Sequence, residues 1–162
     1  VRNPAGAADK QDSIFHFAAS QGLVDVVESI LAKGKTPCDL LDRCGRTALH
    51  RAAEQGHLLV TQALLNAGAN FETRCLQNRT PLMLAAFGGH EEVVCMMLKA
   101  GAGVTKHWGS PLHIAACQGS VAITTALLEA GAHKEARMVN GRSPLHLAVI
   151  NDNIDIVTLL VR

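Results

Sequence analysis

Five related segments recur along this chain at nearly constant spacing. They begin at Ser13, Thr47, Thr80, Ser110 and Ser143 and read SIFHFAASQGL, TALHRAAEQGH, TPLMLAAFGGH, SPLHIAACQGS and SPLHLAVINDN. Successive segments start 34, 33, 30 and 33 residues apart. A repeat of this length is one supersecondary unit that cannot bury its own apolar face. We therefore expect a stack of repeats, each packed against its neighbours.

Each repeat carries the signals of two helices joined by a turn. Ser or Thr precedes the first helix as its N-cap, and Pro follows it in three repeats. The second helix carries paired leucines, at Leu64-Leu65, Leu127-Leu128 and Leu159-Leu160. It ends in Gly-Ala, where glycine supplies the left-handed backbone of a helix C-cap, at Gly68-Ala69, Gly101-Ala102 and Gly131-Ala132. One position of the repeat is expected to be buried throughout, at Leu49, Leu82, Leu112 and Leu145.

The pattern resembles the ankyrin repeat family, with which it shares the Thr-Pro-Leu-His-x-Ala motif and the period of about 33 residues over residues 12–162. The resemblance implies an all-α solenoid of stacked helix-turn-helix units, with projecting β-turn fingers and first helices that line a concave face. We expect an N-terminal linker at residues 1–11 and one domain at 12–162. Its repeats are expected at 12–42, 43–75, 76–105, 106–138 and 139–162. Because no Gly-Ala follows the last leucine pair, either more repeats follow Arg162 or the last helix is bare.

Composition argues against several classes of partner. Fifteen Lys and Arg against fourteen Asp and Glu, spread along the chain, leave no basic patch for nucleic acid. Five cysteines without CxxC spacing argue against a disulfide framework or a zinc site and favour a reducing compartment, the cytoplasm or the nucleus. The sequence has no run of eighteen apolar residues and no signal-peptide pattern, so we expect no direct membrane insertion. Since the chain begins with Val1, residue 1 need not be the natural start.

Neither cofactor nor metal nor catalysis is expected. His16, His50, His113 and His146 share one position of the repeat. They are interpreted as structural residues that bond to a turn, because side chains one repeat apart lie about 10 Å from each other, too far to share a metal ion. The GKT at residues 34–36 lacks the earlier glycine of a phosphate loop and follows a helix. The His and Cys residues that could serve as nucleophile or base fall at repeated or isolated positions.

The family resemblance places partner binding at the finger tips and at the exposed ends of the first helices. The matching finger residues are Arg43, Cys44, Arg46, Leu76, Gln77, Arg79, His107, Trp108, Gly109, Val139, Asn140 and Arg142. The matching first-helix residues are Glu54, Gln55, Phe87, Gly88, Cys117, Gln118, Ile150 and Asn151.

Two features of these residues exceed what a scaffold needs. Arg46, Arg79 and Arg142 share one position and would form a basic ridge, although ordinary solvated surface charge is the simpler explanation of them. Phe87 and Trp108 are large aromatic residues in adjacent repeats, as binding hot spots require. Trp108 lies in a finger that is three residues short, so it could instead fold back over Pro111.

These observations predict a non-catalytic module that binds a protein or peptide, centred on the third and fourth repeats. Within that class three roles stay open. The chain could be an adaptor, the substrate-recruiting domain of a ubiquitin-ligase receptor, or the cytosolic regulatory domain of a larger enzyme or channel.

Overall fold

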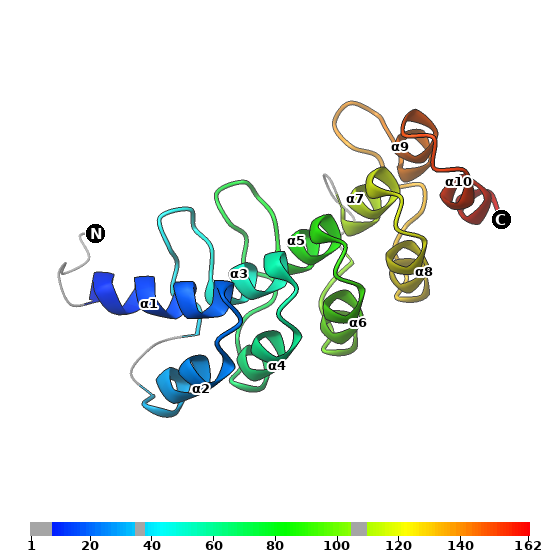
Figure 1. Cartoon of the computed structure of the whole chain (residues 1–162). Helices are drawn as coiled ribbons and strands as arrows, with labels where there is room; N and C mark the ends of the chain where they lie inside the picture. The colour runs from blue at the N-terminus through cyan, green and yellow to red at the C-terminus, as the bar shows by residue number, and fades with distance from the viewer. Residues whose placement is uncertain (1–7, 35–37, 105–109) are drawn as a thin grey trace. The chain divides into compact units, whose positions relative to one another are not determined.

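The computed structural model describes residues 8–34, 38–104 and 110–162, and in these residues the chain forms ten α-helices and no β-strand (Figure 1). The side chains are described from residue 14 onward. The first helices of the hairpins are α1 (Ala8–Ser20), α3 (Ala48–Gln55), α5 (Pro81–Gly88), α7 (Pro111–Gln118) and α9 (Pro144–Ile150). The second helices are α2 (Val24–Ala32), α4 (Leu58–Asn66), α6 (Glu91–Lys99), α8 (Val121–Glu129) and α10 (Ile154–Val161). The predicted all-α array of helical hairpins is confirmed.

Helix starts and stops follow the capping signals of the sequence. The Thr47 hydroxyl accepts a hydrogen bond from the His50 backbone N–H, and Ser143 accepts one from His146 in the same way. Pro occupies the first turn of α7 and α9, where a helix needs no backbone donor. Helices α3 and α7 end at a glycine with positive φ, Gly56 (φ +75°) and Gly119 (φ +79°), a conformation that a residue with a Cβ adopts only at a cost. After α9 the positive φ falls on Asp152 (φ +57°).

The chain divides into two compact units, Val1–Pro81 (unit 1) and Leu82–Arg162 (unit 2). In unit 1, α1 packs beside α3 and α2 beside α4, and each first helix packs on its own second helix. The turns that precede α3 and α5 extend beyond the helix pairs on the same side (Figure 1). Phe15, Leu49 and Leu64 are buried where these helices meet, as predicted for Leu49.

In unit 2, α7 packs on α8 and on α9, while α8 lies against both α6 and α10. Leu82 and Leu112 are buried, as predicted. The same prediction is wrong for Leu145, which is partly exposed although it packs against a small cluster formed with Ala116, Ala148, Ile156 and Leu160. In this chain α9 has a first helix beside it on one side, and Leu145 is therefore covered from that side alone.

The N-terminal boundary also differs from the expected one. Helix α1 begins at Ala8, so residues 8–11, expected in the linker, are helical. Their sequence, Ala-Asp-Lys-Gln, includes three good helix formers, and it extends a helix that the N-cap pattern alone would start at Ser13.

Candidate protein-binding surface

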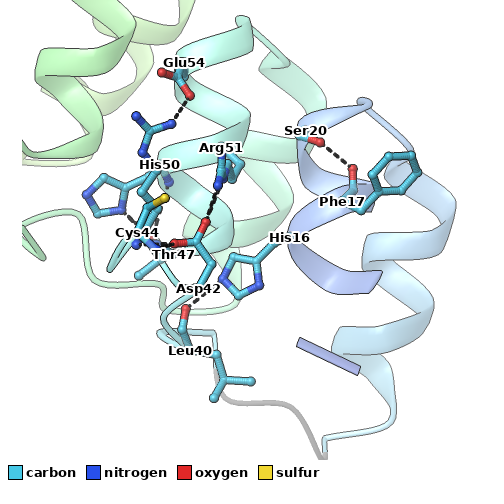
Figure 2. A network of polar contacts seen from close by, with 11 residues as sticks. His16, Phe17, Ser20, Leu40, Asp42, Cys44, Thr47, His50, Arg51 and Glu54 are labelled. Atoms are coloured by element: carbon cyan, nitrogen blue, oxygen red, sulfur yellow. Dashed lines mark hydrogen bonds and ion pairs between the residues drawn. The ribbon is translucent and has the colours of Figure 1, made fainter. Parts of the chain in front are cut away.

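The turn before α3 is held by one carboxylate (Figure 2). Asp42 Oδ1 accepts hydrogen bonds from the backbone N–H groups of Cys44 (2.7 Å) and Arg46 (2.9 Å), and Oδ2 accepts from Arg51 Nε (2.9 Å) on α3. Partial burial opposes ionisation of Asp42. The hydrogen bonds from Arg46, Arg51 and Cys44 outweigh this effect and lower its pKa below the ordinary value. The turn is thereby fixed to the helix that follows it.

Arg46 and Glu54 form an ion pair between this turn and the end of α3. The sequence places both among the partner-binding residues, whereas in the structure each side chain neutralises the other and both are partly buried. Arg79 is half-buried, and its carbonyl oxygen accepts a hydrogen bond from His50. Arg142 in unit 2 is exposed. The three residues of the predicted basic ridge therefore have three different environments.

Three of the repeated histidines connect their first helix to the turn of the next repeat. His50 Nδ1 accepts from the Thr47 backbone N–H (3.1 Å), which leaves Nε2 to donate to the Arg79 carbonyl oxygen (3.1 Å). His113 makes the equivalent contact with the Arg142 carbonyl oxygen (3.3 Å), and His16 with the Leu40 carbonyl oxygen (3.0 Å). The interpretation of these histidines as structural residues is confirmed.

Burial lowers the pKa of His50 and of His113, although the hydrogen bond that each ring makes to a carbonyl oxygen opposes this shift. Both rings are therefore neutral at pH 7. Across the described parts of the chain, no three His, Cys, Asp or Glu side chains lie close enough together to hold a metal ion.

The finger tips of unit 1 carry exposed side chains. Leu76 is 80% exposed, and Arg43, Cys44 and Gln77 are exposed beside it. The Leu76 backbone N–H donates to the Cys44 carbonyl oxygen (3.1 Å), so the two turns lie side by side. Gly45 has φ +68°, and a Cβ there would lie 3.1 Å from the Leu76 side chain and backbone. Glycine thus allows the two fingers to approach each other.

In unit 2, the ends of three consecutive first helices present an exposed apolar row, defined here as Phe87, Cys117 and Ile150. Phe87 is 50% exposed and Ile150 58%, and Cys117 is exposed between them. Gln118 Nε2 donates to the Phe87 carbonyl oxygen (3.0 Å), and Asn151 Nδ2 to Cys117 Sγ (3.5 Å). These contacts join the end of α5 to the end of α7, and the end of α7 to the end of α9.

The remaining predicted residues are scattered over both units. Gln55 at the end of α3 and Gly88 at the end of α5 are exposed, as are Val139 and Asn140 in the last finger. His107, Trp108 and Gly109 lie outside the described residues, so the pairing of Phe87 with Trp108 stays a prediction.

Sequence reasoning missed the Asp42–Arg51 pair and the exposed Phe17 on α1. Arg51 and Phe17 occupy the same position of the repeat. Arg51 and Phe17 stand where the other three first helices carry Leu84, Ile114 and Leu147. An Arg at an otherwise aliphatic position was the available signal, since it requires a nearby partner for its charge.

Two further observations concern the class of protein to which the chain belongs. None of the helices in the described residues is long and apolar enough to cross a membrane. A family model described as ankyrin repeats (3 copies) matches residues 15–107 and 103–162.

The chain spans at most 37% of the length of three proteins that it is similar to. The chain is 36% identical over 151 residues to the ankyrin repeat and KH domain-containing protein mask-1 of Caenorhabditis elegans, a match that spans 89% of this chain and 6% of mask-1. It is 34% identical over 155 residues to the B-cell lymphoma 3 protein homolog of Mus musculus, across 91% of this chain and 34% of that protein. It is 32% identical over 121 residues to the mouse ankyrin repeat and SOCS box protein 5, across 74% of this chain and 37% of that protein. With its motif, its helical hairpins and these matches, the chain belongs to the ankyrin repeat family.

Proposed function

We propose that this chain is a non-catalytic module that binds a partner protein or peptide through the ends of its first helices and its finger tips. Ankyrin repeats are generally protein–protein interaction modules, and domains of this kind are typically non-catalytic and intracellular. The observation that carries the proposal is the apolar row of unit 2, because its three members are exposed at equivalent positions while the neighbouring Ala86, Leu112 and Ala116 are buried. Each member of the row therefore keeps an exposed surface that a partner can cover.

The fingers of unit 1 supply a second contact region. Leu76 is the most exposed large apolar residue among those described, and it lies beside the exposed Arg43 and Gln77. An apolar side chain next to a cation provides both buried area and orientation for a partner. Arg46 and Glu54 contribute less, because a partner would have to break their ion pair.

The test is a comparative capture from cell extract. The parent chain, a Phe87→Ser/Ile150→Ser variant and a Leu59→Ser control are immobilised, and retained proteins are identified by mass spectrometry. Leu59 lies on α4 outside the proposed surface and is 68% exposed, so it matches the change in apolarity. We expect specific proteins to be retained by the parent and by the control but lost from the row variant. Equal retention by all three would count against the row.

Recruitment within a ubiquitin ligase is a second, finer proposal. Besides the SOCS box protein, the chain is 32% identical over 137 residues to the putative E3 ubiquitin-protein ligase XBAT31 of Arabidopsis thaliana, over 29% of that protein. In this proposal the row holds a substrate in the cytoplasm or nucleus, while another part of a longer protein carries the ligase function. Ubiquitination of the captured protein that depends on Phe87 would support this role.

A further inference from the structure

We propose that the apolar row of unit 2 binds a cationic amphipathic helix. This inference rests on the proposed function and narrows the class of partner. It depends on three properties of unit 2, namely the charge around the row, the spacing of its members and its contrast with unit 1.

Acidic side chains lie within five residues of two members of the row, and we take these side chains as its acidic edge. Glu91 and Glu92 follow Phe87 across a short turn, and Asp152 and Asp155 follow Ile150 in the same way. All four side chains are exposed. In the helical hairpins of unit 2, α5–α6, α7–α8 and α9–α10, Lys99 at the opposite end of α6 from Glu91 is the one Lys or Arg, so these segments carry few cations to balance the four carboxylates. A partner that covers the row therefore binds most tightly if it carries positive charge along that edge.

The spacing of the row favours a helix over an extended segment. Its members lie at the ends of α5, α7 and α9. Helix α7 packs on α9, and Gln118 of α7 donates to the Phe87 carbonyl oxygen of α5. The axes of packed helices are about 8–10 Å apart. Residues seven apart on an α-helix rise about 10.5 Å and lie on the same face. On a strand a similar distance corresponds to three residues, which point to opposite faces. A helix can therefore contact successive members with one face and place its cations beside the acidic edge.

Unit 1 lacks this combination. Its equivalents of Phe87 and Ile150 are Ser20 and Glu54, and Glu54 is paired with Arg46. No apolar row is formed by these two positions. The comparison within one chain assigns the binding of such a helix to unit 2.

The test uses a designed peptide as the probe. It is an alanine-based helix of about 18 residues with leucines seven residues apart and lysines along one side of the leucine face. A second peptide carries Glu in place of Lys, and a third carries Ala in place of Leu. Each is labelled with a fluorophore, and its binding to the full chain is followed by fluorescence anisotropy at low and at moderate salt.

We expect the Lys–Leu peptide to bind at least about tenfold more tightly than either relative. Phe87→Ser/Ile150→Ser should weaken its binding by about tenfold or more, whereas the exposed control Leu59→Ser should leave the affinity unchanged. Glu91→Gln/Glu92→Gln should weaken binding at low salt and flatten the salt dependence. Unchanged circular dichroism and melting temperature for each variant would establish that the fold is retained.

Two outcomes would overturn the inference. One is binding of the Glu peptide as tightly as the Lys peptide. The other is equal affinity of the folded row variant and the parent. If either occurs while the capture experiment still finds proteins that depend on Phe87 and Ile150, the protein-binding function survives and only the cationic helix is wrong. Failure of both experiments would overturn the protein-binding role of the row itself.

Discussion

One position of the second helices carries Thr61, Val94 and Thr124, and all three are fully buried. The Thr124 hydroxyl donates to the Ser120 carbonyl oxygen one turn earlier (2.7 Å). Within the described part of the chain, the Thr61 hydroxyl has no hydrogen-bond partner. A buried polar group without a partner has lost its hydration and gained nothing in exchange. The same residue type therefore has different energetic consequences in two repeats.

This difference predicts opposite results for one substitution. Thr61→Val, which installs the residue found at Val94, should raise the free energy of unfolding by about 1 kcal/mol because it removes the unpaired hydroxyl. Thr124→Val, the matched control, removes a bonded hydroxyl and should give no such gain. Urea denaturation followed by circular dichroism measures both values. A destabilised Thr61→Val protein would show that the hydroxyl is satisfied in solution.

At the scale of helices and turns, a buried imidazole joins the second repeat to the third and the fourth repeat to the fifth. His50 and His113 bond both to the cap of their own helix and to the carbonyl of the following turn. His146 bonds to its cap at Ser143 but is exposed. Where the third repeat carries Met83, the position is buried without an imidazole.

This arrangement predicts that stability falls in mild acid. Burial holds the pKa of His50 and His113 below the ordinary 6.5 in the folded chain, so the unfolded chain binds more protons as the pH falls through that value. Their contribution is present above pH 6.5 and is lost as the pH drops toward their lower folded pKa. The Asp42 carboxyl, whose pKa is lowered from 3.8, does not titrate in this range.

The measurement is the denaturation midpoint between about pH 8 and about pH 5. His50→Met/His113→Met is the matched variant, because Met83 fills the equivalent position in this chain. We expect the parent to lose stability over this range and the variant to lose clearly less. Parallel curves for the two proteins would remove the assignment to these histidines.

At the scale of the whole molecule, the features that repeat could be predicted from the sequence and the features that differ between repeats could not. Period and capping residues located the helices, and burial at Leu49, Leu82 and Leu112 followed from their shared position. The ion pair of Arg46 with Glu54 joins residues that periodicity treats as independent surface positions. Such pairings depend on side-chain geometry, which spacing in the sequence does not encode.

Prediction from the sequence was also limited because burial depends on where a repeat lies along the array. Leu145 matches Leu112 in motif and in register, yet the two differ in burial because a residue of a solenoid is covered by the repeats on both sides. The same limit applied to the apolar row. Its exposed apolar residues were selected by position, but its acidic edge became evident only after the helix ends were known to align.

The contrast between Leu112 and Leu145 gives a prediction for the array. Leu112→Ala should lower the free energy of unfolding by about 2–5 kcal/mol, since it removes a fully buried side chain and leaves a cavity between α7 and its neighbours. Leu145→Ala removes the same atoms from a partly exposed site that solvent can refill, and it should cost clearly less. Denaturant unfolding of both variants, followed by circular dichroism, measures the difference. Equal losses would mean that Leu145 is fully covered in solution and that this face of α9 is not exposed.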